Sequence, residues 1–127
     1  TTGIMVHQAI KVCEELGKEG IDVGIIDIFR LKPVNKDLLL KLIREVPQVI
    51  SLEEHLLAGG LGSIIAEIFV DSCLTIPLLR IGQDDRFVFQ MGGRKAIWEQ
   101  NGLDVPGILE QIYEWRSSSK IALSKIE

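Results

Sequence analysis

The stretch with the most potential for chemistry runs from residue 53 to residue 63. It reads Glu53-Glu54-His55-Leu56-Leu57-Ala58-Gly59-Gly60-Leu61-Gly62-Ser63. It follows a short apolar run that is typical of a buried strand and precedes an amphipathic helical pattern. Open α/β sheets bind their ligands at this carboxyl edge. Glycines let a backbone approach a ligand closely, and the amides that open a helix can hold an anion.

Two interpretations of this stretch stay open. It is a tight structural turn in which Ser63 caps the following helix, or it is a ligand or subunit contact. The candidate residues for such a contact are Glu54, His55, Gly59, Gly60, Gly62 and Ser63.

Established phosphate-binding and nucleophile patterns do not fit the stretch. It contains no Gly-Lys-Ser/Thr, and Gly60 with Gly62 supplies only the first half of GxGxxG because Ile65 occupies the next required position. Ser63 is not surrounded by a GxSxG elbow. The pattern therefore names no specific ligand.

Acid–base chemistry has candidates but no complete set. Glu53, Glu54 and His55 are adjacent, and neighbouring side chains on an extended segment point in opposite directions. His55 is the best single candidate because imidazole titrates near neutrality, whereas His7 on the first helix is expected at a surface or interface.

Asp84 and Asp85 offer too few oxygens for a hard cation, and with Arg86 they form a salt-bridged turn or part of an interface. We predict no catalytic, cofactor-binding or metal-binding residue.

Composition excludes several classes of protein. The 127 residues fit one domain, and a net charge of −4, from 14 basic and 18 acidic side chains, argues against a nucleic-acid partner. No apolar stretch approaches the 18 residues of a membrane span, and the first residues do not resemble a secretion signal. Cys13 and Cys73 form no metal or disulfide pattern, so we expect reduced, buried thiols in a cytoplasmic protein.

Helical and strand patterns alternate along most of the chain. Helices are expected over residues 4–16, 36–44, 63–72, 94–100 and 105–115, and strands over residues 23–28, 49–52 and 78–81. Thr2 is expected to cap the first helix. In the second helix, the side chains expected to face inward are Leu38, Leu39, Leu42 and Ile43. Ser117 to Ser119 are expected in a loop. Alternation of this kind predicts a three-layer α/β/α fold with a mostly parallel sheet. Because such folds normally place a strand before a helix, we expect at least one strand to precede Thr1.

A set of short motifs carries a family resemblance. In chain order these are Thr2-Gly3, Glu14-Glu15-Leu16, Gly20-Ile21-Asp22-Val23, Ile26-Asp27, Leu31-Lys32-Pro33-Val34-Asn35, Leu52-Glu53-Glu54-His55, Gly59-Gly60-Leu61-Gly62-Ser63, Arg80-Ile81-Gly82, Asp85-Arg86-Phe87-Val88 and Asn101-Gly102-Leu103-Asp104. Over about residues 1–115 the set resembles the C-terminal domain of transketolase-like, thiamine-diphosphate-dependent enzymes. Transketolase C-terminal sections and deoxyxylulose-phosphate synthase are the more similar branches, and 2-oxo acid dehydrogenase β chains are more distant.

The resemblance implies a five-stranded mixed sheet whose N-terminal strands are missing here, in a domain over 1–115 followed by a tail over 116–127. It implies that thiamine diphosphate and Mg²⁺ bind in the parent enzyme between a pyrophosphate-binding and a pyrimidine-binding domain. The metal motif Gly-Asp-Gly is absent from this chain, so no cofactor is expected on it. Those two domains, on the same chain or a separate subunit, are the implied partners, within a homodimer. The implied function is a non-catalytic domain supporting dimer assembly in ketol transfer between sugar phosphates.

Two alternatives remain open. One is a stand-alone anion- or nucleotide-binding module that uses the loop from Gly59 to Ser63. The other is a subunit-docking domain of a 2-oxo acid dehydrogenase.

Overall fold

The computed structural model describes residues 1–87, 89 and 91–123, with side chains described as far as residue 118. The chain divides into two compact units, Thr1–Phe87 and Val88–Glu127. In the described part of the chain, no helix is long and apolar enough to cross a membrane.

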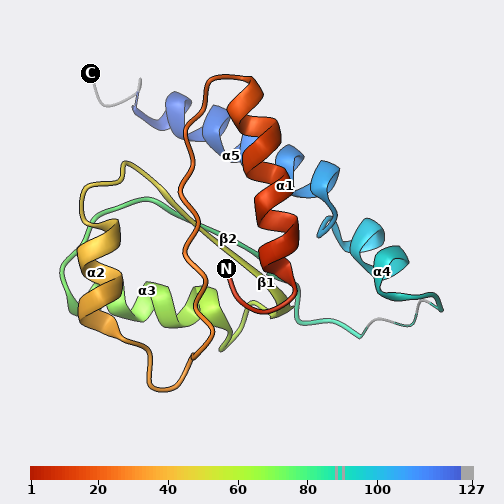
Figure 1. Cartoon of the computed structure of the whole chain (residues 1–127), viewed down its shortest axis with the longest axis horizontal. Helices are drawn as coiled ribbons and strands as arrows, with labels where there is room; N and C mark the ends of the chain where they lie inside the picture. Colours follow the sequence, from red (N-terminus) through yellow and green to blue (C-terminus); the bar gives the residue numbers. More distant parts are fainter. Residues whose placement is uncertain (88, 90, 124–127) are drawn as a thin grey trace. The chain divides into compact units, whose positions relative to one another are not determined.

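The first unit has an α/β fold, as the sequence predicts. Its elements in order are α1 (Met5–Lys18), α2 (Lys36–Ile43), β1 (Val49–Leu56), α3 (Leu61–Asp71) and β2 (Leu78–Gln83), shown in Figure 1. The two strands pair in parallel from Val49 opposite Leu78 to Leu52 opposite Ile81, with a register shift between Leu52 and Leu56. Helix α3 is the crossover between them, and both α1 and α3 pack against β1.

The core beside α3 is built from two helices. It contains Leu39 and Ile43 of α2 with Leu61, Ile65, Ile68 and Phe69 of α3. The expectation that Leu38 and Leu42 also face inward is wrong, because each is 50% exposed. The buried stripe of α2 is therefore only the Leu39/Ile43 row, one turn apart on the same face.

Residues 23–28 do not form the strand that their composition predicts. They run as an extended trace beside α1 in Figure 1 and belong to neither strand of the described sheet. Their backbone partner is Thr1, which donates its amino group to the Ile26 carbonyl at 2.9 Å and accepts from the Ile28 amide at 2.9 Å. A strand needs a neighbouring ladder, and the described sheet has only two strands.

The expected cap of α1 is also wrong. Thr2 donates its hydroxyl to the Ile28 carbonyl at 2.8 Å, and the capping position belongs to Ile4, which makes no side-chain capping bond. Thr2 thus ties the start of the chain to the extended segment instead of closing the helix.

The two cysteines differ from the expected pair of buried thiols. Both are free, but Cys73 is exposed and only Cys13 is partly buried. Desolvation raises the pKa of the Cys13 thiol, which keeps it protonated at neutral pH.

The second unit contains α4 (Arg94–Asn101) and α5 (Val105–Leu123). Helix α4 ends at Gly102, whose φ of +65° is the left-handed exit expected for this position. Helix α5 runs through the serines expected to form a loop, and within it Ser117 and Ser118 donate their hydroxyls to the carbonyls of Tyr113 and Glu114 one turn back. Of the expected tail, residues 124–127 lie outside the described part.

Asn35 offers a test of local stability. Its side-chain oxygen accepts from the Leu38 amide at 3.1 Å, as a cap of α2 should. Replacing it, Asn35→Ala, is expected to lower the free energy of unfolding by about 1 kcal/mol, measured by urea denaturation. Asn35→Asp, which keeps an acceptor, is the control, and equal losses in both variants would contradict the capping role.

Candidate functional site

The Gly-rich turn is organised by the carboxylate of Glu53. This side chain is 1% exposed although it carries an ionisable group. One carboxylate oxygen accepts from the Leu61 amide at 2.7 Å and the other from the Gly62 amide at 2.9 Å. These amides open α3 and have no partner within the helix. The carboxylate therefore closes the N-terminus of α3 from the neighbouring strand.

The sequence interpretation placed the strand end and the helix start differently. Strand β1 continues through Glu53, Glu54 and His55, which were expected in a loop, and α3 begins at Leu61 with Gly60 as its cap. Ser63 is inside the helix, so its expected capping role is wrong. Glu53 follows an apolar run, but its burial depends on amide donors eight and nine residues further along the chain, so no local pattern identifies it as the acceptor.

Two glycines permit the helix to approach the strands closely. A Cβ on Gly60 would overlap the Glu53 carboxylate and lie 2.5 Å from the Leu56 carbonyl oxygen. A Cβ on Gly62 would lie 2.6 Å from the Ser51 hydroxyl and 2.8 Å from Nε of Arg80. Gly59 has a φ of +75°, which turns the chain sharply before the helix. These glycines therefore fit a compact turn without any ligand.

Ser63 and Arg80 hold the other side of the turn. The Ser63 hydroxyl donates to the Leu57 carbonyl at 2.8 Å and accepts from the Gly59 amide at 3.0 Å. Arg80 Nη2 donates to the same Leu57 carbonyl and to the Ser63 hydroxyl. The turn is thus fastened at both ends, by Glu53 and by the Ser63–Arg80 pair. An arginine within an otherwise apolar strand was the sequence signal for this role, and it was missed.

Two polar atoms beneath Gly62 have no hydrogen-bond partner in the described part of the chain. They are the Ser51 hydroxyl and Nε of Arg80, both fully buried as atoms. They lie on the paired residues Ser51 and Arg80 of the two strands. These are the same two atoms that a Cβ at position 62 would meet, so a side chain there would press on polar groups that already lack a partner.

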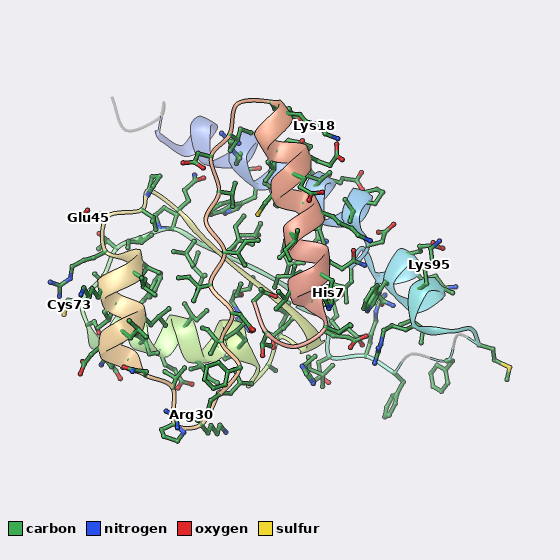
Figure 2. The ribbon with its side chains drawn as sticks, in the orientation of Figure 1. His7, Lys18, Arg30, Glu45, Cys73 and Lys95 are labelled. Atoms are coloured by element: carbon green, nitrogen blue, oxygen red, sulfur yellow. The ribbon has the colours of Figure 1, made fainter. Side chains whose placement is uncertain are left out.

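The remaining sequence candidates do not join this cluster. His55 is exposed and Glu54 is half-buried on the last part of β1. Figure 2 shows His7 on α1 and Cys73 on the opposite side of the first unit. Asp84 to Arg86 form an exposed bend closed by the Arg86 amide bonding to the Asp84 carbonyl at 2.8 Å.

The described residues do not fit a magnesium diphosphate. Among them, no group of three or more His, Cys, Asp or Glu side chains could hold a metal ion. The Leu61 and Gly62 amides, which open α3, already donate to the Glu53 carboxylate.

Comparison with known proteins identifies the family. Residues 1–108 match the family described as transketolase, C-terminal domain. The chain belongs to that family. The 1-deoxy-D-xylulose-5-phosphate synthase of Gloeobacter violaceus is 35% identical over 120 residues, which is 94% of this chain and 19% of the relative. The enzyme of the same name from Rippkaea orientalis is 36% identical over 112 residues, 88% of this chain and 18% of the relative.

A solved structure agrees with this assignment. A split-gene transketolase, described as an inactive β4 tetramer, superposes with a TM-score of 0.78 and 32% identity, covering 89% of this chain and 36% of that one. The chain spans less than a fifth of the length of the curated relatives named above. This transketolase C-terminal domain is thus similar to one part of longer enzymes.

Removing the Glu53 carboxylate tests its structural role. Glu53→Ala leaves two buried amides without an acceptor, so we expect the free energy of unfolding to fall by roughly 3 kcal/mol. The adjacent Glu54→Ala, at a half-buried position, is the matched control and should cost under about 1 kcal/mol. Chemical denaturation of both variants measures the difference, and similar losses would contradict the assignment.

The glycine at position 60 offers an independent test. Gly60→Ala forces the Glu53 carboxylate off the helix amides, with an expected loss of about 2 kcal/mol. Gly17→Ala, where a Cβ meets nothing within 4 Å, is the control and should leave stability unchanged or slightly higher. Thermal melting compares them, and a neutral Gly60→Ala would show that the close approach is not required.

Proposed function

We propose that this chain is a non-catalytic domain of a thiamine-diphosphate-dependent enzyme, where it supports assembly of the catalytic domains. The observation that carries the proposal is the buried Glu53 carboxylate on the Leu61 and Gly62 amides. The residues best placed to bind an anion are used to fix a helix to a strand. The site is therefore a structural junction, and the chemistry belongs to other domains.

An exposed apolar surface on the first unit supports a role in assembly. Phe29 is 88% exposed, and Leu38 and Leu42 are each half exposed. All three line a hollow of about 160 Å³ between the extended segment and α2. Apolar surface of this kind marks protein contacts in soluble proteins. We propose that it packs against the pyrimidine-binding domain of the parent enzyme, which acts as a homodimer.

The proposed parent activity is ketol transfer between sugar phosphates or synthesis of deoxyxylulose phosphate. Thiamine diphosphate, bound with Mg²⁺ by the pyrophosphate- and pyrimidine-binding domains, supplies the carbanion chemistry there. The relatives named 1-deoxy-D-xylulose-5-phosphate synthase favour the second activity. The proposal places the protein in the cytoplasm, where its two free thiols stay reduced.

Complementation tests the proposal. The pyrophosphate- and pyrimidine-binding domains, expressed as a separate polypeptide, are assayed for synthase and transketolase turnover with and without this chain. We expect this chain alone to be inactive and the mixture to exceed the catalytic domains alone at least tenfold, because assembly completes the active dimer. Turnover by this chain alone, or full activity of the catalytic domains without it, would contradict the proposal.

The apolar surface has its own test. Phe29→Asp changes an exposed side chain, so the melting temperature of the isolated chain should stay within a few degrees. The same change should weaken co-elution with the catalytic domains at least tenfold in analytical gel filtration, because it places a charge in an apolar contact. Glu45→Lys, at an exposed position outside the hollow, is the control. Equal association by both variants would show that this surface is not the contact.

A further inference from the structure

The exposed apolar surface around Phe29 is bordered by basic side chains. Arg30 follows Phe29 and lines the hollow between the extended segment and α2. Four more basic residues lie within two positions of a residue that lines the hollow, namely Lys32, Lys36, Lys41 and Arg44. Lys36 is half-buried and the others are exposed. An apolar centre with a polar rim is the usual anatomy of a protein interface.

The basic residues of this rim form no ion pairs within the described part of the chain. None of the five side chains makes a hydrogen bond or a salt bridge there. The acidic residues of the same stretch are Asp27, which lines the hollow, Asp37, and Glu45, which lies beyond the end of α2 opposite Arg30 in Figure 2. Residues 27–45 thus hold five basic and three acidic residues, a charge of +2, whereas the other nine basic and 15 acidic residues give −6.

The hollow has the volume of one ring-sized side chain. An apolar cavity of about 150 Å³ accommodates a benzene ring, and this hollow measures about 160 Å³. Its walls include Val34 with Leu38 and Leu42, and each of these leucines is 50% exposed. A concave apolar site of this size suits a single anchoring side chain presented by a protein. Peripheral membrane contact relies instead on a continuous apolar face that enters the bilayer.

Lys41 places a positive charge directly beside the apolar surface. It is three residues after Leu38 and next to Leu42 on α2, and all three side chains are exposed. Residues three apart on a helix are neighbours on its surface. Arg30 and Lys41 therefore come from the two elements that form the hollow, the extended segment with its following loop and α2.

We propose that this surface, formed by Phe29, Leu38 and Leu42 with Arg30 and Lys41 beside them, binds an acidic amphipathic segment of a protein partner. The segment places one aromatic or branched aliphatic side chain in the hollow and its carboxylates against the basic rim. Opposite charges steer association and fix its register, and the buried anchor supplies affinity. The assignment of this segment to the pyrimidine-binding domain rests on the proposed function, whereas its chemistry rests on the charges and the hollow.

Synthetic peptides test the chemistry of the partner. The probe is Glu-Glu-Leu-Phe-Glu-Glu-Leu-Phe-Glu-Glu with blocked ends, titrated into the ¹⁵N-labelled chain and followed by NMR. We expect saturable shifts of the Phe29, Leu38 and Leu42 amides with a Kd of about 1 mM or tighter. High ionic strength should weaken binding at least tenfold, because salt screens exposed charges.

Two control peptides separate charge from apolar contact. One has Lys in place of every Glu, and the other has Ser in place of every Leu and Phe. Each should bind at least tenfold more weakly than the probe. Absence of saturable shifts with the probe, or equal binding of the probe and either control, would overturn the proposal.

Reversal of the rim charge gives a second readout. The double variant Arg30→Glu with Lys41→Glu should bind the acidic probe at least tenfold more weakly and should bind the lysine peptide in its place. Lys11→Glu with Lys95→Glu changes the net charge equally at exposed positions outside the hollow and is the matched control. It should bind the probe as the unaltered chain does. Equal binding of the probe by the two double variants would overturn the proposal.

A vesicle assay distinguishes a membrane from a protein partner. Sedimentation of the chain with vesicles of equal parts phosphatidylserine and phosphatidylcholine, without saturable binding of the acidic probe, would show a membrane surface and overturn the proposal. The peptide titrations contain no catalytic domains, so their failure leaves the complementation result untouched. Binding of the probe together with failed complementation would contradict the proposed function and leave the chemistry of this surface standing.

Discussion

The constraint on which the first unit depends is the burial of one carboxylate. Glu53 must be satisfied because an ionised group excluded from water is costly without hydrogen-bond donors. The Leu61 and Gly62 amides provide those donors at 2.7 and 2.9 Å. This requirement accounts for where α3 begins, how closely it approaches β1, and why position 60 is glycine. The Gly-rich turn between β1 and α3 resembles a ligand-binding loop, but this contact makes it the junction between a helix and a sheet.

Function follows from how the polar groups of the turn are used. Ser63 and Arg80 are engaged with the Leu57 carbonyl, and Glu53 with the helix amides. His55 lies exposed on β1 without a second acid–base group converging on it from the described residues. The first unit thus has a turn fastened at both ends and an exposed apolar surface around Phe29, which is consistent with the assembly role that we propose.

Much of this fold could be predicted from the sequence because its helices carry clear apolar periodicity. The α/β class, α2 with its Asn35 cap, the start of β1 and the exit of α4 at Gly102 all follow from local patterns. The end of β1 could not be predicted, because the burial of Glu53 depends on donors eight and nine residues away. The capping role given to Ser63 failed for the same reason: the strand supplied the acceptor instead. Residues 23–28 show the reverse case, in which strong local strand preference lacks the ladder it needs.

A titration with inorganic phosphate tests most directly the central claim that the Glu53 carboxylate occupies the amides at the start of α3. If the Glu53 carboxylate occupies the Leu61 and Gly62 amides, the chemical shifts of these two amides should not change as phosphate is added to the ¹⁵N-labelled chain at constant ionic strength. A saturable shift of both amides at micromolar phosphate would show that they are available to an anion, and would contradict this account.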